Sequence, residues 1–264
     1  MSYNFEQLLD AFKKIGVKKG DNILVKGDLR YLGQFTDNQK IAQSHFEALS
    51  KIIDLKKGTI IVSTASESLC NTNIPFDINN TKSERGAFSE FIRKQKKSIR
   101  SMHPFNSHCS TGKFAKYICL NNSKNSFGAE SPKDRMLKIN TKYLSVGLPP
   151  RLTCSFIHHA EMLMGVPYRY TKEFYHPIKR DEKIRKELFY MFVCYKNIDI
   201  KRNLNIKLFN YLKKKKLKIN SSKLGEGKIY LYDCNDFVNK SKLYLKDNIY
   251  GWLDKSPNKR PYAK

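Results

Sequence analysis

The run Cys154-Ser-Phe-Ile-His-His-Ala-Glu161, continued by Gly165-Val-Pro-Tyr-Arg169, is the most informative stretch of the sequence. It sets His158 and Glu161 three residues apart in a segment that reads as a helix, and residues at this spacing face the same side of a helix. A carboxylate beside an imidazole can orient it as a general base. Such pairs are also common on helix surfaces, where they form only weak ion pairs. The spacing alone therefore does not establish a catalytic role for His158 and Glu161.

Five other motifs accompany this stretch in a fixed order along the chain. They are VKGDLRYLG (25–33), GTIIVST (58–64), NIPFD (73–77) with TKSERG (81–86), RSMHPFNS (100–107) and FGAESP (127–132). With the stretch that contains His158, the chain resembles the aminoglycoside 3-N-acetyltransferase family over roughly residues 5–180. Because all six motifs occur in the family's order, the resemblance is far more specific than any one of them.

The resemblance implies a layered α-β-α fold with a mixed central sheet, acetyl-CoA as cosubstrate and no metal. It implies that His158 is the general base and that Glu161 orients it. It also implies coenzyme contacts from Lys26, Gly27, Asp28, Leu29, Ser63, Thr64, Lys82, Ser83, Arg85, Gly86, Arg100, Ser101, His103 and Ser107. Asp77, His103 and Arg169 are expected to contact the acceptor.

Several of these residues have a second interpretation that the sequence leaves open. His103 can equally be a structural loop residue that bonds backbone groups, and Asp77 can form an Asx-turn. Lys26 stands where the family has a histidine, so it can either approach a phosphate or pair with Asp28. His159 lies about 100° around the helix from His158, which favours a core position.

Three departures from the family motifs concern the acceptor more than the fold. Lys26-Gly-Asp28 replaces His-Ser-Ser, Phe105-Asn106 replaces Thr-His, and Lys82 replaces a proline. The family also contains members that acetylate amino groups on molecules other than antibiotics, and the chain looks most like a member that acts on sugar nucleotides.

The net charge of +26, from 50 basic and 24 acidic residues, bears on the acceptor. Solvated surface lysines account for part of it, but such a field still attracts anions. Aminoglycosides are polycations, so we expect a nucleotide-linked amino sugar, such as a dTDP-3-amino- or 4-amino-dideoxyhexose, in polysaccharide synthesis. An aminoglycoside is the alternative acceptor. A basic cavity beside His158 would favour the nucleotide sugar, and an acidic one the aminoglycoside.

The composition excludes several other classes of protein. The 264 residues, 40% of them hydrophobic, include no apolar run long enough to span a membrane, and the N-terminus does not have the layout of a secretory signal. Six scattered cysteines indicate reduced thiols in a cytoplasmic protein and no zinc site. No nucleic-acid-binding motif accompanies the charge. We expect small-molecule partners only, and the sequence leaves a homodimer open.

Apolar spacing predicts helices over 5–15, 41–53 and 85–94, and strands over 23–25, 59–63 and 143–146. Ser155 is the expected N-cap of the helix that carries His158. Residues 189–195 and 228–232 read as strands, and 237–252 contains helix. Because strands alternate with helices, we expect an α/β fold. We expect one domain over 1–264, in which 171–264 is a less regular C-terminal subregion.

Overall fold

The structure is a computed structural model that describes residues 2–37, 40–196, 199–203 and 205–258. The strands are β1 (Ser2–Tyr3), β2 (Asn22–Gly27), β3 (Gln34–Phe35), β4 (Thr59–Ser63), β5 (Phe76–Asp77), β6 (Ile99–Arg100), β7 (His108–Gly112), β8 (Lys142–Val146), β9 (Arg169–Arg180), β10 (Lys183–Cys194), β11 (Asn220–Leu224) and β12 (Gly227–Asp233). The helices are α1 (Phe5–Lys14), α2 (Ile41–Ile53), α3 (Ala87–Arg93), α4 (Ala115–Cys119), α5 (Pro132–Lys138), α6 (Pro150–Thr153), α7 (Ile157–Met164), α8 (Ile206–Lys214) and α9 (Cys234–Asp247).

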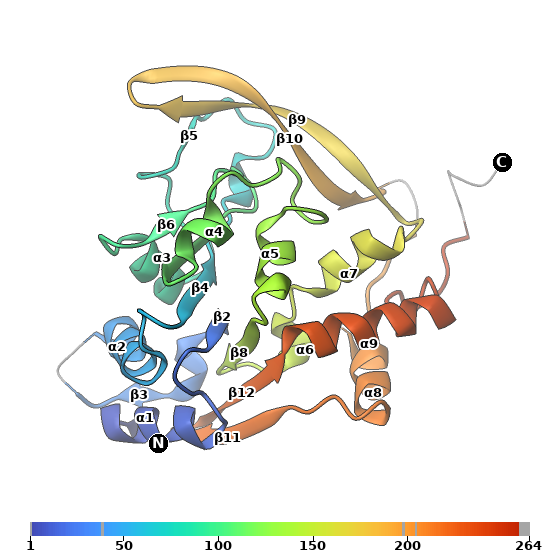
Figure 1. The fold of residues 1–264 in the computed structure, drawn as a ribbon. Helices are drawn as coiled ribbons and strands as arrows, with labels where there is room; N and C mark the ends of the chain where they lie inside the picture. The colour runs from blue at the N-terminus through green and yellow to red at the C-terminus, as the bar shows by residue number, and fades with distance from the viewer. Residues whose placement is uncertain (1, 38–39, 197–198, 204, 259–264) are drawn as a thin grey trace.

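A seven-stranded sheet in the order β11-β12-β8-β2-β4-β7-β6 forms the centre of the molecule (Figure 1). Strand β2 runs parallel to both β4 and β8, whereas β7 and β12 pair antiparallel with their neighbours. The mixed central sheet predicted from the resemblance is therefore confirmed.

Alternation along the central strands gives the sheet two apolar faces. Ile23 and Ile60 belong to the core beneath α1, α2 and α3, whereas Leu24 and Ile61 belong to the core that packs against α7 and α9. The expected three-layer arrangement follows, because each face of the sheet buries its side chains against helices.

The predicted helices and central strands correspond to α1, α2, α3, β2, β4 and β8. Helix α1 begins with a capping box, in which Asn4 and Gln7 satisfy each other's backbone N–H groups. The expected N-cap at Ser155 is wrong. Helix α7 starts at Ile157 with Phe156 as N-cap, because the Ser155 backbone is engaged by Lys133 and Tyr143 instead.

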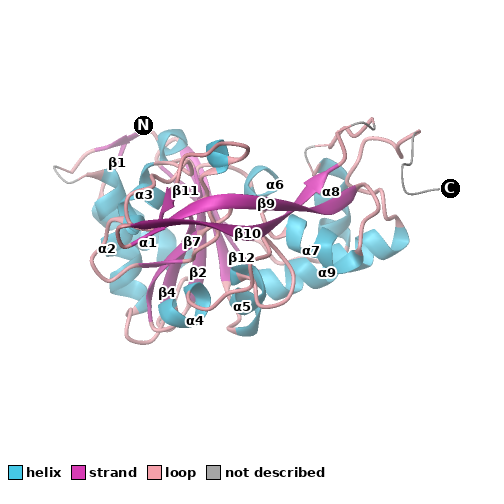
Figure 2. Cartoon of the chain, turned by 90° about the horizontal axis from the view of Figure 1, so that it is seen from above, coloured by secondary structure: helices cyan, strands magenta, loops and turns pink. Residues whose placement is uncertain are grey.

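The strand predicted over 189–195 is the second half of β10, but its pairing with β9 in a long hairpin was not predicted from the sequence. The two strands pair over all twelve residues of each, and β5 joins β9 in parallel. The hairpin arches over the central sheet, from the region of β5 to that of α7 (Figures 1 and 2). Pro177 within β9 and the many charged residues of both strands weaken the sequence signal for a strand.

The C-terminal subregion contributes to the central sheet as well as to the hairpin. Strands β11 and β12 extend the sheet beyond β8, and α9 packs on α7. We therefore propose that residues 1–264 form one domain. Among the described residues, no helix is long and apolar enough to cross a membrane.

Candidate active site

His158 and Glu161 lie on one face of α7, as their spacing predicts. The Nδ1 atom of His158 is 2.8 Å from Oε2 of Glu161. The His158 side chain keeps 28% of its surface exposed, whereas that of Glu161 keeps only 1%. The carboxylate is therefore enclosed by protein, and the imidazole faces open space.

Two residues of the motif that follows α7 hold the Glu161 carboxylate. The Tyr168 hydroxyl donates to Oε1 at 2.9 Å, and Nε of Arg169 forms an ion pair with Oε2 at 2.9 Å. Arg169 also donates to the carbonyl of Phe192 in β10 at 3.2 Å. A buried carboxylate is stable only when it is paired and hydrogen-bonded, and these contacts meet that need.

Burial, more than these contacts, determines the protonation state of His158. Burial lowers the pKa of His158 to about 4, and the positive charge of Arg169 lowers it further, against the raising effect of Glu161. A carboxylate next to an imidazole favours its charged form, but at His158 the effect of burial is larger. The imidazole is therefore neutral near pH 7.

The tautomer of His158 follows from the shorter of two contacts at Nδ1. A carboxylate at 2.8 Å requires a proton on Nδ1, whereas Arg169 lies farther away, with Nη2 at 3.2 Å. With Nδ1 protonated, the lone pair is on Nε2, and no described residue hydrogen-bonds that atom. Nε2 is thus a free base at the wall of a cavity.

This cavity has a volume of about 1040 Å³. It lies between the ends of β2 and β4, the segment from α6 to α7, and Met191–Cys194 of β10. Ligand pockets typically measure ~300–1000 Å³, so the volume suits two substrates that meet. Six residues predicted from the sequence line it together: Lys26, Ser63, Arg85, His158, Glu161 and Arg169.

The lining of the cavity is strongly basic. It includes Lys26, Arg85, Lys133, Arg169, Lys196 and Arg202, against the two carboxylates of Glu67 and Glu161. Both carboxylates are already paired with arginines, Glu67 with Arg85 and Glu161 with Arg169. A basic cavity beside His158 is the outcome that favours an anionic acceptor.

Arg100 does not line the cavity, although it was predicted to contact the coenzyme. Nε donates to Ser107, one terminal nitrogen to the carbonyls of Ile78 and Thr81, and the other to Ser66 and the carbonyl of Thr64. A guanidinium has five N–H groups, and all of them are used here. We therefore interpret Arg100 as the residue that fixes the loop before α3.

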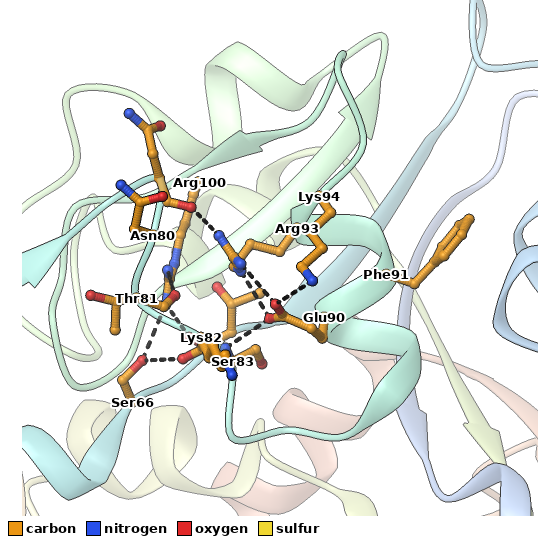
Figure 3. Close-up of polar contacts among 12 residues, drawn as sticks. Ser66, Asn80, Thr81, Lys82, Ser83, Glu90, Phe91, Arg93, Lys94 and Arg100 are labelled. Carbon is orange, nitrogen blue, oxygen red and sulfur yellow. Dashed lines mark hydrogen bonds and ion pairs between the residues drawn. The ribbon is translucent and has the colours of Figure 1, made fainter.

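The same loop contains Lys82 and Ser83, two more of the predicted coenzyme contacts (Figure 3). The Lys82 carbonyl accepts from Ser66, and the Ser83 N–H donates to Glu90 at 2.9 Å. Glu90 is held in turn by Arg93 of the same helix. Neither Lys82 nor Ser83 lines the cavity, and the Lys82 side chain is exposed.

His103 and Asp77, predicted to contact the acceptor, form local backbone interactions outside the cavity. Nε2 of His103 is 3.2 Å from the Tyr190 carbonyl, and Nδ1 accepts from two backbone N–H groups that follow it. Asp77 accepts from the N–H groups of Asn79 and Asn80 in an Asx-turn. The structural interpretation that the sequence left open thus describes both residues.

The remaining predicted contacts also lie outside the cavity lining. Thr64, Ser101 and Ser107 are buried, and each makes hydrogen bonds within the protein. The others are Gly27, Asp28, Leu29 and Gly86. Asp28 pairs with Arg30 at 2.6 Å and not with Lys26. Of the two interpretations of Lys26, the pairing with Asp28 is therefore not the one that the structure shows.

Sequence reasoning missed Lys133 and Cys154 in the cavity lining. Lys133 directly follows the FGAESP motif, and Cys154 opens the stretch quoted first, so nearness to the motifs was the available signal. His159 is fully buried, as expected, and accepts from the Gly128 N–H at 3.4 Å. The described residues contain no group of His, Cys, Asp and Glu that could hold a metal.

A family model described as "Aminoglycoside 3-N-acetyltransferase" matches residues 24–246. No curated protein matches the sequence.

Several solved structures share the fold at low sequence identity. AAC-IIIb, solved as a binary complex with CoASH, has a TM-score of 0.80 at 18% identity and covers 97% of this chain and 100% of its own. Sisomicin-bound AAC-VIa has a TM-score of 0.80 at 20% identity, covering 94% and 99%. YokD from Bacillus subtilis has a TM-score of 0.76 at 19% identity, covering 92% and 99%.

Proposed function

The chain belongs to the aminoglycoside 3-N-acetyltransferase family, and we propose that it transfers the acetyl group of acetyl-CoA to a primary amine of an amino sugar. The observation that carries the proposal is the free Nε2 of His158 on the cavity wall, with Nδ1 held by Glu161. The CoASH complex of AAC-IIIb supports the choice of coenzyme. We propose that the enzyme acts in the cytoplasm.

The reaction needs a base, because a sugar amine near neutral pH is partly protonated, as model α-amino groups with a pKa of ~8 are. Nε2 of His158 takes the proton from the amine as its nitrogen attacks the thioester carbonyl. The C–N bond forms, the C–S bond breaks, and the departing thiolate receives a proton to give CoASH. Glu161 keeps the proton on Nδ1 and stabilises the imidazolium that forms. Ser63 and Arg85, which also line the cavity, are proposed contacts of the coenzyme.

The first candidate acceptor is an aminoglycoside. The family description names this acceptor, and solved neighbours hold sisomicin or a gentamicin. These comparisons favour an aminoglycoside over the nucleotide sugar expected from the sequence. Acetylation of the drug would consume one of its charged amines and weaken its binding to anionic targets.

A nucleotide-linked amino sugar is the second candidate, and the charge of the cavity favours it. Six basic residues line the cavity against two carboxylates that are already paired. Such a lining attracts a diphosphate and repels a polycation. In this case the product would serve polysaccharide synthesis.

The test is release of thiol from acetyl-CoA, followed spectrophotometrically with two acceptors in parallel. One is gentamicin, and the other is a dTDP-linked 3-amino-dideoxyhexose, with its 4-amino isomer as a companion. Release with gentamicin would support the first candidate, and release with a nucleotide sugar only would support the second. A chain that binds acetyl-CoA but releases no thiol with any amine would refute acetyl transfer.

A further inference from the structure

Two lysines that form no ion pair with a described carboxylate line the cavity. Lys26 directly follows the buried residues of β2 and is itself partly buried, and Lys133 lies in the first turn of α5 with 2% of its surface exposed. Nζ of Lys133 donates to the Ser155 carbonyl at 3.2 Å and lies over the Phe127 ring at 5.0 Å. No described carboxylate forms an ion pair with either lysine.

Three acidic residues, close to Lys26 in the chain or in the cavity lining, form ion pairs with other residues. Asp28 pairs with Arg30 at 2.6 Å, and Glu67 pairs with Arg85. Glu161 is held by Arg169 and His158. Among the described residues, no carboxylate therefore forms an ion pair with Lys26 or Lys133, and Glu67, already paired with Arg85, only partly offsets the loss of solvent at Lys26.

Burying an unpaired ammonium group is unfavourable, because the desolvation penalty is not offset by an opposite charge. Burial lowers the pKa of Lys26 to about 8 and lowers the pKa of Lys133 well below its usual value. Both lysines line the same cavity, and the positive charge of Lys26 also contributes to the lowered pKa of Lys133. A bound anion would remove this penalty.

A third unpartnered group lies in the same sheet, on β7, two strands from Lys26. Both ring nitrogens of His108 are buried and have no hydrogen-bond partner among the described residues. The charges of Lys133 and Lys26 both act to lower the pKa of His108. In the sheet, His108 is opposite Ser63 and Lys26 is opposite Ser145, so polar residues form a row at the end of β8, β2, β4 and β7.

We propose that Lys26 and Lys133 form an anion subsite that holds a carboxylate or phosphate group of the amine acceptor. The proposal rests on the proposed function, since it assigns this group to the acceptor of the acetyl-transfer reaction. The acceptor is then an amine that also carries an anionic group. This role replaces the coenzyme contact that the resemblance implied for Lys26.

Position favours the acceptor over the phosphates of the coenzyme. The ring of Phe127 contacts both Lys133, at 5.0 Å, and the ring of His158, at 5.8 Å, so the subsite is one aromatic ring from the base. In acetyl-CoA the pantetheine arm separates the thioester from the diphosphate. Phosphates of a coenzyme whose thioester lies at His158 are therefore remote, and the exposed cations Lys196 and Arg202 of the lining suit them better.

Thermal unfolding with inorganic phosphate as the probe tests the subsite without any turnover. Lys26→Met removes one cation of the subsite, and Lys116→Met is the matched control, because Lys116 is exposed and lies outside the cavity lining. Phosphate should raise Tm of the native protein and the control. The rise in Tm with phosphate should be clearly smaller for Lys26→Met. When phosphate is absent, Lys26→Met should unfold at a higher temperature than the native protein. Equal phosphate effects in the two variants would overturn the subsite.

Repeating the measurement with saturating CoA separates the two possible sources of the anion. If the subsite belongs to the acceptor, the phosphate effect that depends on Lys26 persists when CoA is bound. If CoA abolishes this effect, the lysines bind the coenzyme and the proposal fails. Lys133→Met, examined in the same way, should lose the phosphate effect as Lys26→Met does.

Steady-state kinetics with matched acceptors give the second readout. Glucosamine 6-phosphate and glucosamine differ only in the anionic group. Lys26→Met should raise KM for the phosphorylated acceptor by about tenfold or more, the loss of one charge-assisted hydrogen bond, and leave KM for acetyl-CoA within about twofold. An equal fall in kcat for both acceptors, with KM unchanged, would instead assign Lys26 to the transition state. If neither amine releases thiol, that result counts against the proposed function, and the phosphate measurement still decides the subsite on its own.

Discussion

Arg169→Met should shift the pH dependence of catalysis through His158. In the native protein Nη2 of Arg169 is 3.2 Å from Nδ1 of His158, and the pKa of the imidazole is about 4. Two unit charges about 4 Å apart interact with ~4 kcal/mol at an effective dielectric constant near 20. Because His158 keeps 28% of its side chain exposed, we take about half of this, ~2 kcal/mol, which is ~1.5 pH units.

The variant should therefore have an apparent pKa of roughly 5.5 for His158. The sign follows from the charges. Removing a cation, and leaving Glu161 without its ion pair, favours the protonated imidazole, so the free base is lost at a higher pH than in the native protein. At pH 5 the neutral fraction should fall roughly fourfold relative to the native protein, whereas at pH 8 both should be fully neutral.

The assay is kcat/KM for the acceptor from pH 5 to pH 8, at saturating acetyl-CoA. Dividing the variant profile by the native profile cancels the titration of the acceptor amine. Arg169→Lys is the matched control, because it keeps the positive charge, and its ratio should vary much less with pH. A ratio for Arg169→Met that stays constant over this range would refute the electrostatic role of Arg169, provided that the variant melts cooperatively.

Three further substitutions test other parts of the structure. His158→Ala should lower kcat by about 100-fold or more, whereas the affinity for CoA, measured by calorimetry, should be largely unchanged. Near-normal turnover in the folded variant would exclude His158 as the base. Arg100→Leu should lower the free energy of unfolding, measured with urea, by roughly 3–5 kcal/mol, because it leaves buried acceptors without donors. An unchanged midpoint of urea unfolding would contradict the structural role of Arg100. Gly27→Ala should lower the free energy of unfolding by ~1–3 kcal/mol or more, because the φ of Gly27 is +148° and a Cβ would lie 1.9 Å from the Val146 carbonyl oxygen. Wild-type stability of this variant would show that the strand end adapts to the added methyl group.

The pair of His158 and Glu161 could be predicted because their relation is local. Helical geometry alone brings positions i and i+3 together, and the 2.8 Å contact between them follows from that spacing. The same reasoning could not predict the protonation state of His158. That state depends on burial and on Arg169, which reaches the site from the start of β9.

The predicted coenzyme contacts show where motif order stops being informative. Arg85 and Arg100 are both basic residues within resembling motifs, and the sequence treats them alike. Only Arg85 lines the cavity, whereas every N–H group of Arg100 bonds an oxygen of the protein. Whether a cation is free for a ligand depends on acceptors that the fold brings from distant parts of the chain.

Motif order and short-range spacing were enough to predict the family, the mixed α/β fold and the His-Glu pair, because these features are local in the chain. The remaining features depend on packing between distant segments. That packing placed a long charged hairpin over the sheet, brought Lys26 and Lys133 into one cavity without an ion pair among the described residues, and paired Asp28 and Glu67 with other cations. Net charge counts basic residues without locating them, and only the folded arrangement determines which charges share a cavity and which are already neutralised.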